Sequence, residues 1–303
     1  MYPTSKLILV LVFLFFACRN SYSQADYTDT KEIIKQCSSD SILSYLKQFE
    51  ALGIKELGTP ALDKTAQWLE NKYISFGYQK IVKDSFNFKN NKLVNLVVEK
   101  KGSIYPDSLL IICGHYDTKN GPGAGDNGSG TAVILEIARI FSKINTSVSI
   151  RFIQFSAEEE GLIGSDHYVN QVLPKENPEI KLVLNIDAIG GVAGKKNNVL
   201  VCEFDKESPP ASNNQKSLEF AKKLSFFIEK YSNLKTRLNR AYASDYMPFE
   251  QKGYVITGIY EDNQSPYAHT DKDIISNIDV GYIFEAAKGV VAAVAYFTGI
   301  EKE

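Results

Sequence analysis

The sequence predicts a three-layer α/β/α sandwich built around a mixed, largely parallel central sheet. Two observations lead to this fold class. Short apolar segments alternate with segments of helical spacing from residue 109 to the C-terminus, which is typical of strands and their covering helices in α/β proteins. The length of 303 residues and the 44% share of hydrophobic residues also fit one large globular domain.

The N-terminal part of the chain is predicted to contain two helices and two strands. A first helix covers residues 42–49, and a second follows the turn-forming Gly58, Thr59 and Pro60. Residues 83–88 and 93–99 are predicted strands. The apolar positions that define the helices are Ile42, Leu43, Tyr45, Leu46 and Phe49 in the first, and Leu62, Ala66, Leu69 and Tyr73 in the second.

The alternating region follows. Strands are predicted at residues 109–113, 149–155, 182–186, 199–204 and 255–260, and helices at residues 131–141, 165–172, 217–231 and 280–297. The connection between residues 204 and 217 is rich in Pro, Ser and Asn, so we interpret it as a surface loop rather than a domain boundary.

Residues 1–23 are predicted to be a signal peptide, which leaves residues 24–303 as a single domain. Lys6 precedes an apolar run over residues 7–17, as in the charged and apolar regions of secretory signals. The run is shorter than the roughly 20 residues that a membrane-spanning helix needs. Ser21 and Ser23 supply the small residues of a cleavage site, so we place the cut before Gln24.

An alternative for the N-terminus is a lipoprotein acylated on Cys18. Phe15 and Phe16 stand where small or aliphatic residues are expected, which favours the cleaved signal. We therefore expect an exported protein, periplasmic or extracellular, with no stable membrane partner beyond signal processing.

Charge and cysteine content exclude some other classes. The net charge of -2 and the absence of a basic stripe give no reason to expect nucleic acid. Past the signal, Cys37, Cys113 and Cys202 are too few and odd in number for a disulfide framework. Cys113 and Cys202 lie in apolar runs and are predicted to be buried, while a bridge from Cys37 to one of them stays open.

Histidine is scarce, which makes its placement informative. Of the three histidines, His115 directly follows an apolar strand and His269 lies in a polar loop after another. Asp117 is close enough to His115 to orient its imidazole through the second ring nitrogen. His167 lies on a predicted helix and is interpreted as a surface or structural residue.

Four acidic residues stand in comparable places. Asp126 lies in the Gly-rich segment 121–130, which has neither the lysine of a P-loop nor the glycine spacing of a dinucleotide fingerprint. Glu158 and Glu159 follow the strand 149–155, and Asp187 closes the strand 182–186. Adjacent glutamates point in different directions, so one is able to bind metal while the other accepts a proton.

These residues together predict a metal site, although each alone also fits a solvated polar turn. Strand carboxyl ends meet at one edge of a parallel sheet. Nitrogen and oxygen ligands without thiolate suit Zn²⁺, and also Co²⁺ or Mn²⁺. Five ligands exceed what one catalytic zinc takes, which favours two zinc ions per chain with Asp126 shared. The predicted ligands are His115, Asp126, Glu159, Asp187 and His269.

The sequence resembles the secreted bacterial two-zinc aminopeptidase family, the leucyl-aminopeptidase-like zinc exopeptidases. The resemblance covers roughly residue 93 to the C-terminus. It is carried, in family order, by His115-Tyr116-Asp117, Gly125-Asp126-Asn127-Gly128-Ser129-Gly130, Ala157-Glu158-Glu159-Glu160-Gly161, Asn185-Ile186-Asp187 and His269-Thr270.

The resemblance implies roles for these residues. It implies that His115 and Asp187 bind one zinc, that Glu159 and His269 bind the other, and that Asp126 bridges them. It further implies that Glu158 is the catalytic base and acid, that Asp117 orients His115, and that the Asp126–Asn127 peptide is cis. The implied reaction is hydrolysis of the first bond of peptide substrates with a free N-terminus.

Two points leave alternatives open. Ala268 stands where some family members place a tyrosine that stabilises the oxyanion, with Tyr267 one step earlier, and Asp245 is predicted to be structural or to face the substrate. A glutaminyl-peptide cyclase with a single zinc shares the fold, but the only tryptophan, Trp68, is far from the position such cyclases use. A non-catalytic relative is disfavoured because the five ligands and Glu158 are all present.

Overall fold

The computed structural model describes residues 30–206 and 209–300, so the predicted signal peptide and Cys18 lie outside the described residues. The labelled elements are α2 (Ser39–Ala51), α3 (Pro60–Phe76), β1 (Ile81–Phe88), β2 (Asn91–Lys100), β3 (Tyr105–His115), α4 (Gly128–Phe141), β4 (Val148–Phe155), α5 (Ile163–His167), a π-helical turn (Tyr168–Val172), α6 (Leu173–Glu176), β5 (Glu179–Ile186), β6 (Val199–Phe204), α7 (Asn214–Tyr231), β7 (Lys235–Arg240), α8 (Met247–Glu250), β8 (Ile256–Glu261), a 3₁₀ turn (Ile275–Asn277) and α9 (Val280–Thr298).

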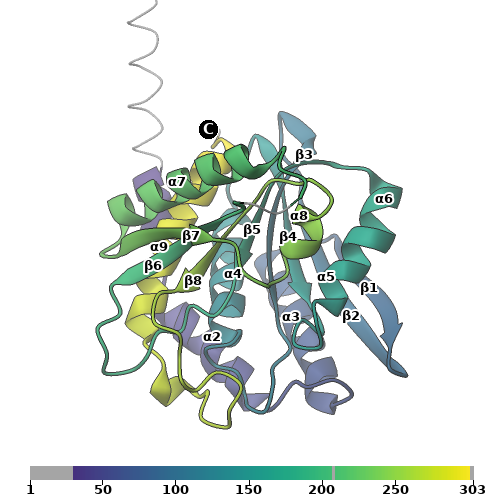
Figure 1. Cartoon of the computed structure of the whole chain (residues 1–303), viewed down its shortest axis with the longest axis vertical. Coiled ribbons are helices and arrows are strands. Elements are labelled where there is room, and N and C mark those ends of the chain that lie inside the picture. The colour runs from purple at the N-terminus through teal and green to yellow at the C-terminus, as the bar shows by residue number, and fades with distance from the viewer. Residues whose placement is uncertain (1–29, 207–208, 301–303) are drawn as a thin grey trace, which may run out of the picture.

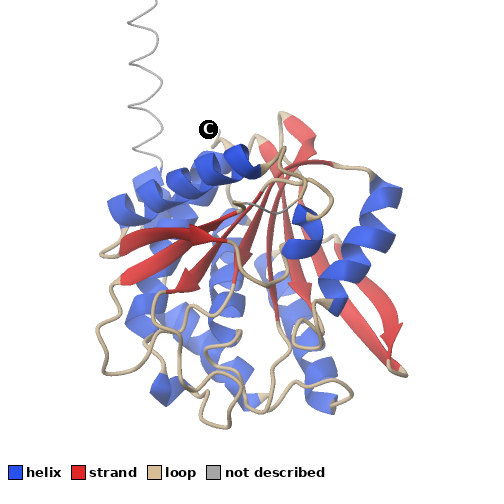
Figure 2. Ribbon diagram, viewed as in Figure 1, coloured by secondary structure: helices blue, strands red, loops and turns tan. Residues whose placement is uncertain are grey.

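The eight strands form one mixed sheet in the order β1-β2-β4-β3-β5-β8-β6-β7 (Figure 1). The four central strands β4, β3, β5 and β8 are parallel. The β1–β2 hairpin joins one side antiparallel, and β6, antiparallel to β8, carries β7 on the other side. Helices cover both faces (Figure 2). The predicted three-layer sandwich is therefore confirmed.

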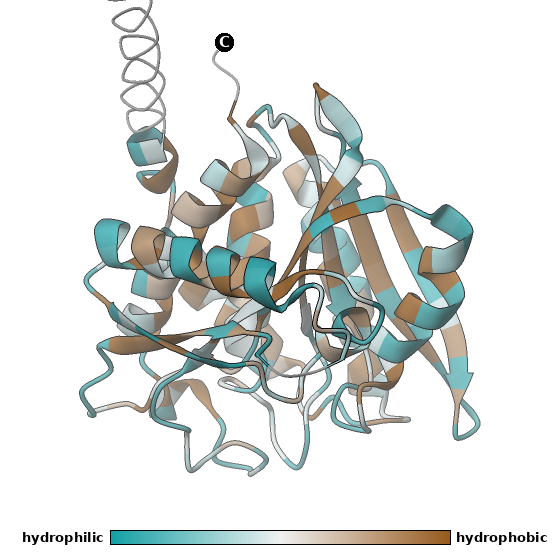
Figure 3. Cartoon of the chain, turned by 45° about the horizontal axis from the view of Figure 1, so that its top comes forward, coloured by the Kyte–Doolittle hydropathy of each residue, from teal (hydrophilic) through white to brown (hydrophobic). Residues whose placement is uncertain are grey.

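Alternation along β3 shows how the two faces are buried. Leu110 and Ile112 contribute to a large core beneath α2, α3, α4, α7 and α9, while Leu109, Ile111 and Cys113 contribute to a smaller core beneath α6 and α8. Because both faces are covered, β3 is continuously apolar from Leu109 to Cys113, and hydrophobic residues predominate in the middle of the sheet (Figure 3). Helix α9 is long and apolar enough to cross a membrane, but most of it is buried in the larger core.

The structure differs from the sequence prediction in several elements, including the short α6 and the 3₁₀ turn, which were not predicted. β7 and the one-turn helix α8 were not predicted. β7 is an edge strand with exposed, mostly polar side chains, so it lacks the apolar alternation that marks a strand. The predicted helix 165–172 is interrupted by the π-helical turn Tyr168–Val172. Pro174 follows two residues after the turn, and its missing N–H removes a regular helical hydrogen bond there.

A buried ion pair joins β2 to β4 within the sheet, away from the carboxyl end of β4 that the predicted metal site occupies. Arg151 Nε donates to Glu99 Oε2 at 2.8 Å, and Arg151 Nη1 donates to the hydroxyl of Tyr168 at 2.7 Å. Burial alone would raise the pKa of Glu99, but the hydrogen bonds and charge of Arg151, with help from Lys101, lower it to about 2.

Replacing Arg151 by methionine is expected to destabilise the fold by about 3–5 kcal/mol, because the buried Glu99 then loses its buried partner and is left with the exposed Lys80 and Lys101. Urea unfolding measures the loss, and the double variant with Glu99→Leu should recover most of it. Because the pKa of Glu99 is lowered on folding, its stabilisation is present above about pH 4.5 and is lost as the pH falls toward 2. A double variant no more stable than Arg151→Met would contradict this account.

Candidate metal centre

The predicted site residues lie at the carboxyl ends of the four central strands. His115 is the last residue of β3, Glu158 and Glu159 follow β4, Asp187 follows β5, and His269 lies in the loop after β8. Asp126 lies in the Gly-rich loop between β3 and α4. Because these strands are parallel neighbours, residues separated by more than 150 positions meet at one sheet edge.

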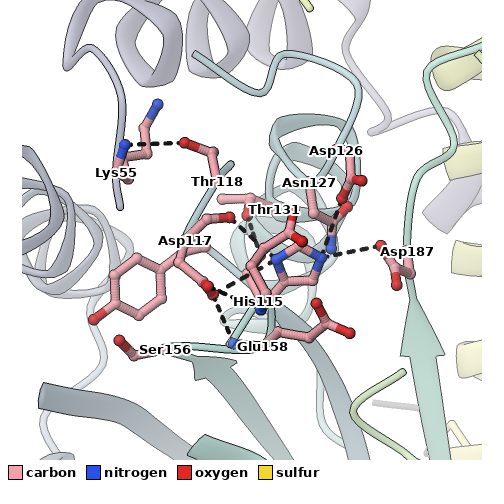
Figure 4. Close-up of polar contacts among 12 residues, drawn as sticks. Lys55, His115, Asp117, Thr118, Asp126, Asn127, Thr131, Ser156, Glu158 and Asp187 are labelled. Atoms are coloured by element: carbon pink, nitrogen blue, oxygen red, sulfur yellow. Dashed lines mark hydrogen bonds and ion pairs between the residues drawn. The ribbon is translucent and has the colours of Figure 1, made fainter. Parts of the chain in front are cut away.

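The side chains form two triads that share Asp126. In the first, His115 Nε2 lies 3.2 Å from Asp187 Oδ1 and 3.3 Å from Asp126 Oδ1. In the second, His269 Nε2 lies 2.9 Å from Glu159 Oε1 and 3.3 Å from Asp126 Oδ2. The donor atoms of each triad all lie within 4.8 Å of one another. Figure 4 shows Asp126 and Asp187 meeting His115 from the same side.

The charges of the centre favour a cation. Burial would lower the pKa of His115, but Asp187 and Glu158 raise it well above its usual value. Burial would raise the pKa of Asp126, but the two histidines lower it. The two triads place three carboxylates around two imidazoles. Glu159 Oε1 is buried and, although His269 Nε2 lies 2.9 Å away, it accepts no hydrogen bond from the described residues. Nitrogen and oxygen donors in this arrangement fit a divalent metal such as Zn²⁺.

Asp117 acts on the backbone of the neighbouring acidic turn. Its Oδ1 and Oδ2 accept hydrogen bonds from the N–H groups of Glu158 and Glu159, both at 3.1 Å. His115 Nδ1 is nearer to the Asp117 carbonyl oxygen, at 3.1 Å, than to its carboxylate, at 3.6 Å. The predicted neighbourhood of Asp117 and His115 is present, but the carboxylate mainly fixes the backbone that carries the two glutamates.

Glu158 belongs to neither triad. Burial raises the pKa of its carboxyl, and Asp187, Asp245 and Asp117 raise it further against the opposing charge of His115. With a pKa of about 10 the carboxyl is protonated at neutral pH in the absence of a metal ion, and a nearby cation would lower this pKa toward the range of a base. Glu158 lies outside the two triads, whereas Glu159 is a member of the second.

Three residues at the centre have left-handed backbones although none is glycine. They are Ala157 before Glu158, Ala188 after Asp187, and His269 itself, with φ of 58°, 41° and 58°. Such conformations cost about 1–2 kcal/mol each and are retained where neighbouring groups fix them. Asp117 fixes the turn after Ala157, and Ala188 N–H donates to Asn127 Oδ1 at 3.2 Å.

Asn127 and Ser244 are anchors that the sequence analysis did not identify. Asn127 Nδ2 donates to the Ile186 carbonyl at 3.0 Å, which ties the cis peptide Asp126–Asn127 to the end of β5. Ser244 Oγ donates to Asp187 Oδ2 at 2.6 Å. The position of Ser244 beside the acidic Asp245, in a segment matching the resembled family, was the available signal.

Replacing Ser244 by alanine is expected to weaken metal binding by roughly 10–100-fold, because groups that hold a ligand carboxylate tune its affinity by this amount. A Zn²⁺ titration of the metal-free chain measures the effect. Ser225→Ala is the control. It removes a hydroxyl of α7 that lies 2.6 Å from the hydroxyl of Thr236 in β7, so it should leave the titration unchanged. Equal affinities for Ser244→Ala and the wild type would contradict the expectation.

The remaining sequence predictions have clear outcomes. His167 stacks on Phe86 and contacts Asp84, so its structural interpretation is confirmed. Cys113 and Cys202 are buried and, like Cys37, are free thiols in the structure. Asp245 is completely buried, which fits the structural role rather than the substrate-facing one.

Relatives in sequence point to one family. The chain is 32% identical over 223 residues to aminopeptidase YwaD of Bacillus subtilis, covering 71% of this chain and 47% of that protein. It is also 32% identical over 178 residues to an aminopeptidase of Pseudomonas aeruginosa, covering 57% of this chain and 32% of that protein. The chain thus spans less than half the length of these two curated relatives.

Several solved structures have a similar fold. A zinc aminopeptidase from Bacillus subtilis superposes with a TM-score of 0.59 at 31% identity, over 71% of this chain and 52% of its own. The LapA aminopeptidase of Legionella pneumophila gives 0.76 at 23% identity, over 91% and 75%. A Bacteroides thetaiotaomicron glutaminyl cyclase gives 0.71 at 18% identity, over 85% and 97%. The last two likenesses show the fold alone.

A family model covers most of the domain, including both triads. Residues 95–294 match the model of peptidase family M28. This match spans more than half of the chain and begins where the resemblance noted in the sequence begins. The chain belongs to peptidase family M28.

Proposed function

We propose that this protein is a metal-dependent aminopeptidase that uses two zinc ions. The observation that carries the proposal is the pair of triads sharing Asp126 beside the buried Glu158, which lies outside both triads. Two metals about 3.5–4 Å apart with a shared ligand are typical of aminopeptidases and related hydrolases. The names of the sequence relatives support the peptidase class, and the name of the Bacillus subtilis structure supports zinc.

The two triads support one assignment of the ligands. His115 and Asp187 would hold one zinc, Glu159 and His269 the other, and Asp126 both. When bound, the metals would polarise the scissile carbonyl and lower the pKa of a water molecule toward neutrality.

The other residues supply proton transfer and recognition. Glu158 takes a proton from the attacking water and delivers it to the leaving amine, a role that its place outside both triads supports. Asp117 keeps Glu158 in place by binding its backbone N–H. The surplus of carboxylates would attract the protonated α-amine of a peptide, so the substrates are peptides with a free N-terminus.

We further propose that the protein is exported, because Lys6 and the apolar run that follows it have the composition of a cleaved signal. N-terminal sequencing of the mature protein should give Gln24 as its first residue. A first residue of acylated Cys18 would favour the lipoprotein alternative instead.

One assay tests the proposed activity. The zinc-loaded protein is expected to hydrolyse aminoacyl-p-nitroanilides and to leave their N-acetylated counterparts intact. Cleavage of the blocked substrates would contradict the aminopeptidase assignment. Cyclisation of N-terminal glutamine by a protein with one zinc per chain would instead favour the glutaminyl cyclase alternative. The likeness to the solved glutaminyl cyclase shows a shared fold.

A further inference from the structure

Of the two histidines in the triads, His269 is the more exposed. Its side chain is 45% exposed, whereas that of His115 is 1% exposed. It lies in a long loop after β8, and its backbone has a left-handed φ of 58°. The other two left-handed positions are fixed by Asp117 and Asn127, so a corresponding anchor is expected for His269.

Asp273, four residues after His269, provides such an anchor. Its Oδ1 accepts a hydrogen bond from Gly125 N–H at 2.7 Å, and its Oδ2 accepts one from Asp126 N–H at 3.0 Å. Its carbonyl oxygen accepts a third from Ala124 N–H at 3.0 Å. Asp273 is only 2% exposed. One residue of the His269 loop thus binds three successive residues of the loop that carries Asp126.

The Gly-rich segment is shaped for this contact. A Cβ on Gly125 would lie 2.9 Å from Asp273 Oδ1, and a Cβ on Gly121 would lie 1.8 Å from the Thr270 carbonyl oxygen. Any side chain at these positions would push the two loops apart. These two glycines of the segment 121–130 therefore serve loop-to-loop packing.

Lys55 supports the buried charge of Asp273. Its buried side chain donates through Nζ to the carbonyls of Pro122 and Gly53 at 2.8 and 2.7 Å. Burial lowers the pKa of Lys55 to about 7, and the negative charge of Asp273 opposes this shift. The cation therefore ties the Gly-rich segment down from the side of α2. A buried carboxylate that accepts charge-assisted hydrogen bonds near a cation holds its partners firmly.

We propose that Asp273 is a positioning residue that sets the separation of His269 from Asp126 and so completes the second triad for its metal ion. The inference rests on the proposed function, because it takes both triads to be metal sites. The first triad has its own anchors, Asn127 and Ser244. Loss of Asp273 should therefore weaken one metal site and spare the other.

The test is a Co²⁺ titration of the metal-free full-length chain, followed by calorimetry and visible absorption. The wild type is expected to bind two ions. Asp273→Asn keeps the size of the side chain but turns a donor toward a backbone N–H. It should weaken one binding step by roughly 10–100-fold and leave the other unchanged. Gly125→Ala should reproduce this pattern without altering Asp273, and both variants should lose the absorption bands of the second ion.

Asp279→Asn is the matched control. The Asp279 carboxylate also accepts a backbone hydrogen bond, from Tyr282 N–H at 3.1 Å, but it lies in neither triad. The Asp279→Asn substitution should lower the thermal midpoint of unfolding without changing the Co²⁺ titration. If Asp273→Asn weakens both steps equally, or neither, the inference is overturned while the proposed function stands. A wild type that binds a single ion overturns both.

Discussion

Glu158→Gln is expected to abolish peptide hydrolysis while the protein still binds its metals. Glutamine has nearly the same shape, but it cannot accept the proton of the attacking water. Loss of a positioned base typically lowers kcat by about 10²–10⁴-fold. Because Glu158 belongs to neither triad, metal analysis should give the same zinc content as the wild type. Burial disfavours the charged carboxylate, so the thermal midpoint of the metal-free variant should not fall.

Glu160→Gln is the natural control for this variant. Glu160 stands in the same acidic turn, two residues on, but its carboxylate pairs with Lys89 at the surface, at 2.6 Å. The substitution should leave kcat, KM and zinc content unchanged, since surface ion pairs contribute little. Full activity in Glu158→Gln would refute the assigned base. Loss of zinc together with activity would place Glu158 among the ligands instead.

Much of the candidate site could be predicted from the sequence, because its residues follow parallel strands whose carboxyl ends meet at one side of the sheet. Polar residues that directly follow apolar strands identified His115, Asp187 and the Glu158–Glu159 pair, and a parallel sheet necessarily brings such strand ends together. The fold class followed from the same alternation. The edge strand β7 could not be predicted, since its exposed polar side chains have no apolar face to mark it.

The anchors of the site were not predictable in the same way. Asn127, Ser244 and Asp273 act through contacts with residues 57 to 148 positions away, and a single sequence does not show such distances. The carboxylate of Asp117 was predicted to hold His115, since the two residues are close in the chain. Its actual partners, the N–H groups of Glu158 and Glu159, become neighbours only when β3 and β4 pair.

Asp126→Asn is expected to remove metal from both triads, which distinguishes it from every other ligand substitution. Asp126 Oδ1 faces His115 and Oδ2 faces His269, so an amide replaces one of these two oxygen donors by an NH₂ group and removes the shared negative charge from both triads. Each metal contributes several kcal/mol of transition-state stabilisation. Since 1.36 kcal/mol corresponds to tenfold in rate, kcat/KM should fall by roughly three orders of magnitude or more.

Zinc content and the rise in thermal midpoint on zinc addition check this expectation alongside the rate. A ligand that binds only the folded state raises its stability in proportion to the logarithm of its concentration over Kd, so weaker binding gives a smaller rise. Asp84→Asn is the control. Asp84 Oδ1 also contacts a histidine, His167 Nε2 at 3.1 Å, but outside the triads, so zinc content and rate should stay at wild-type values. If Asp126→Asn kept two zinc ions per chain, Asp126 would not be the shared ligand, and the two triads would have to be separate sites.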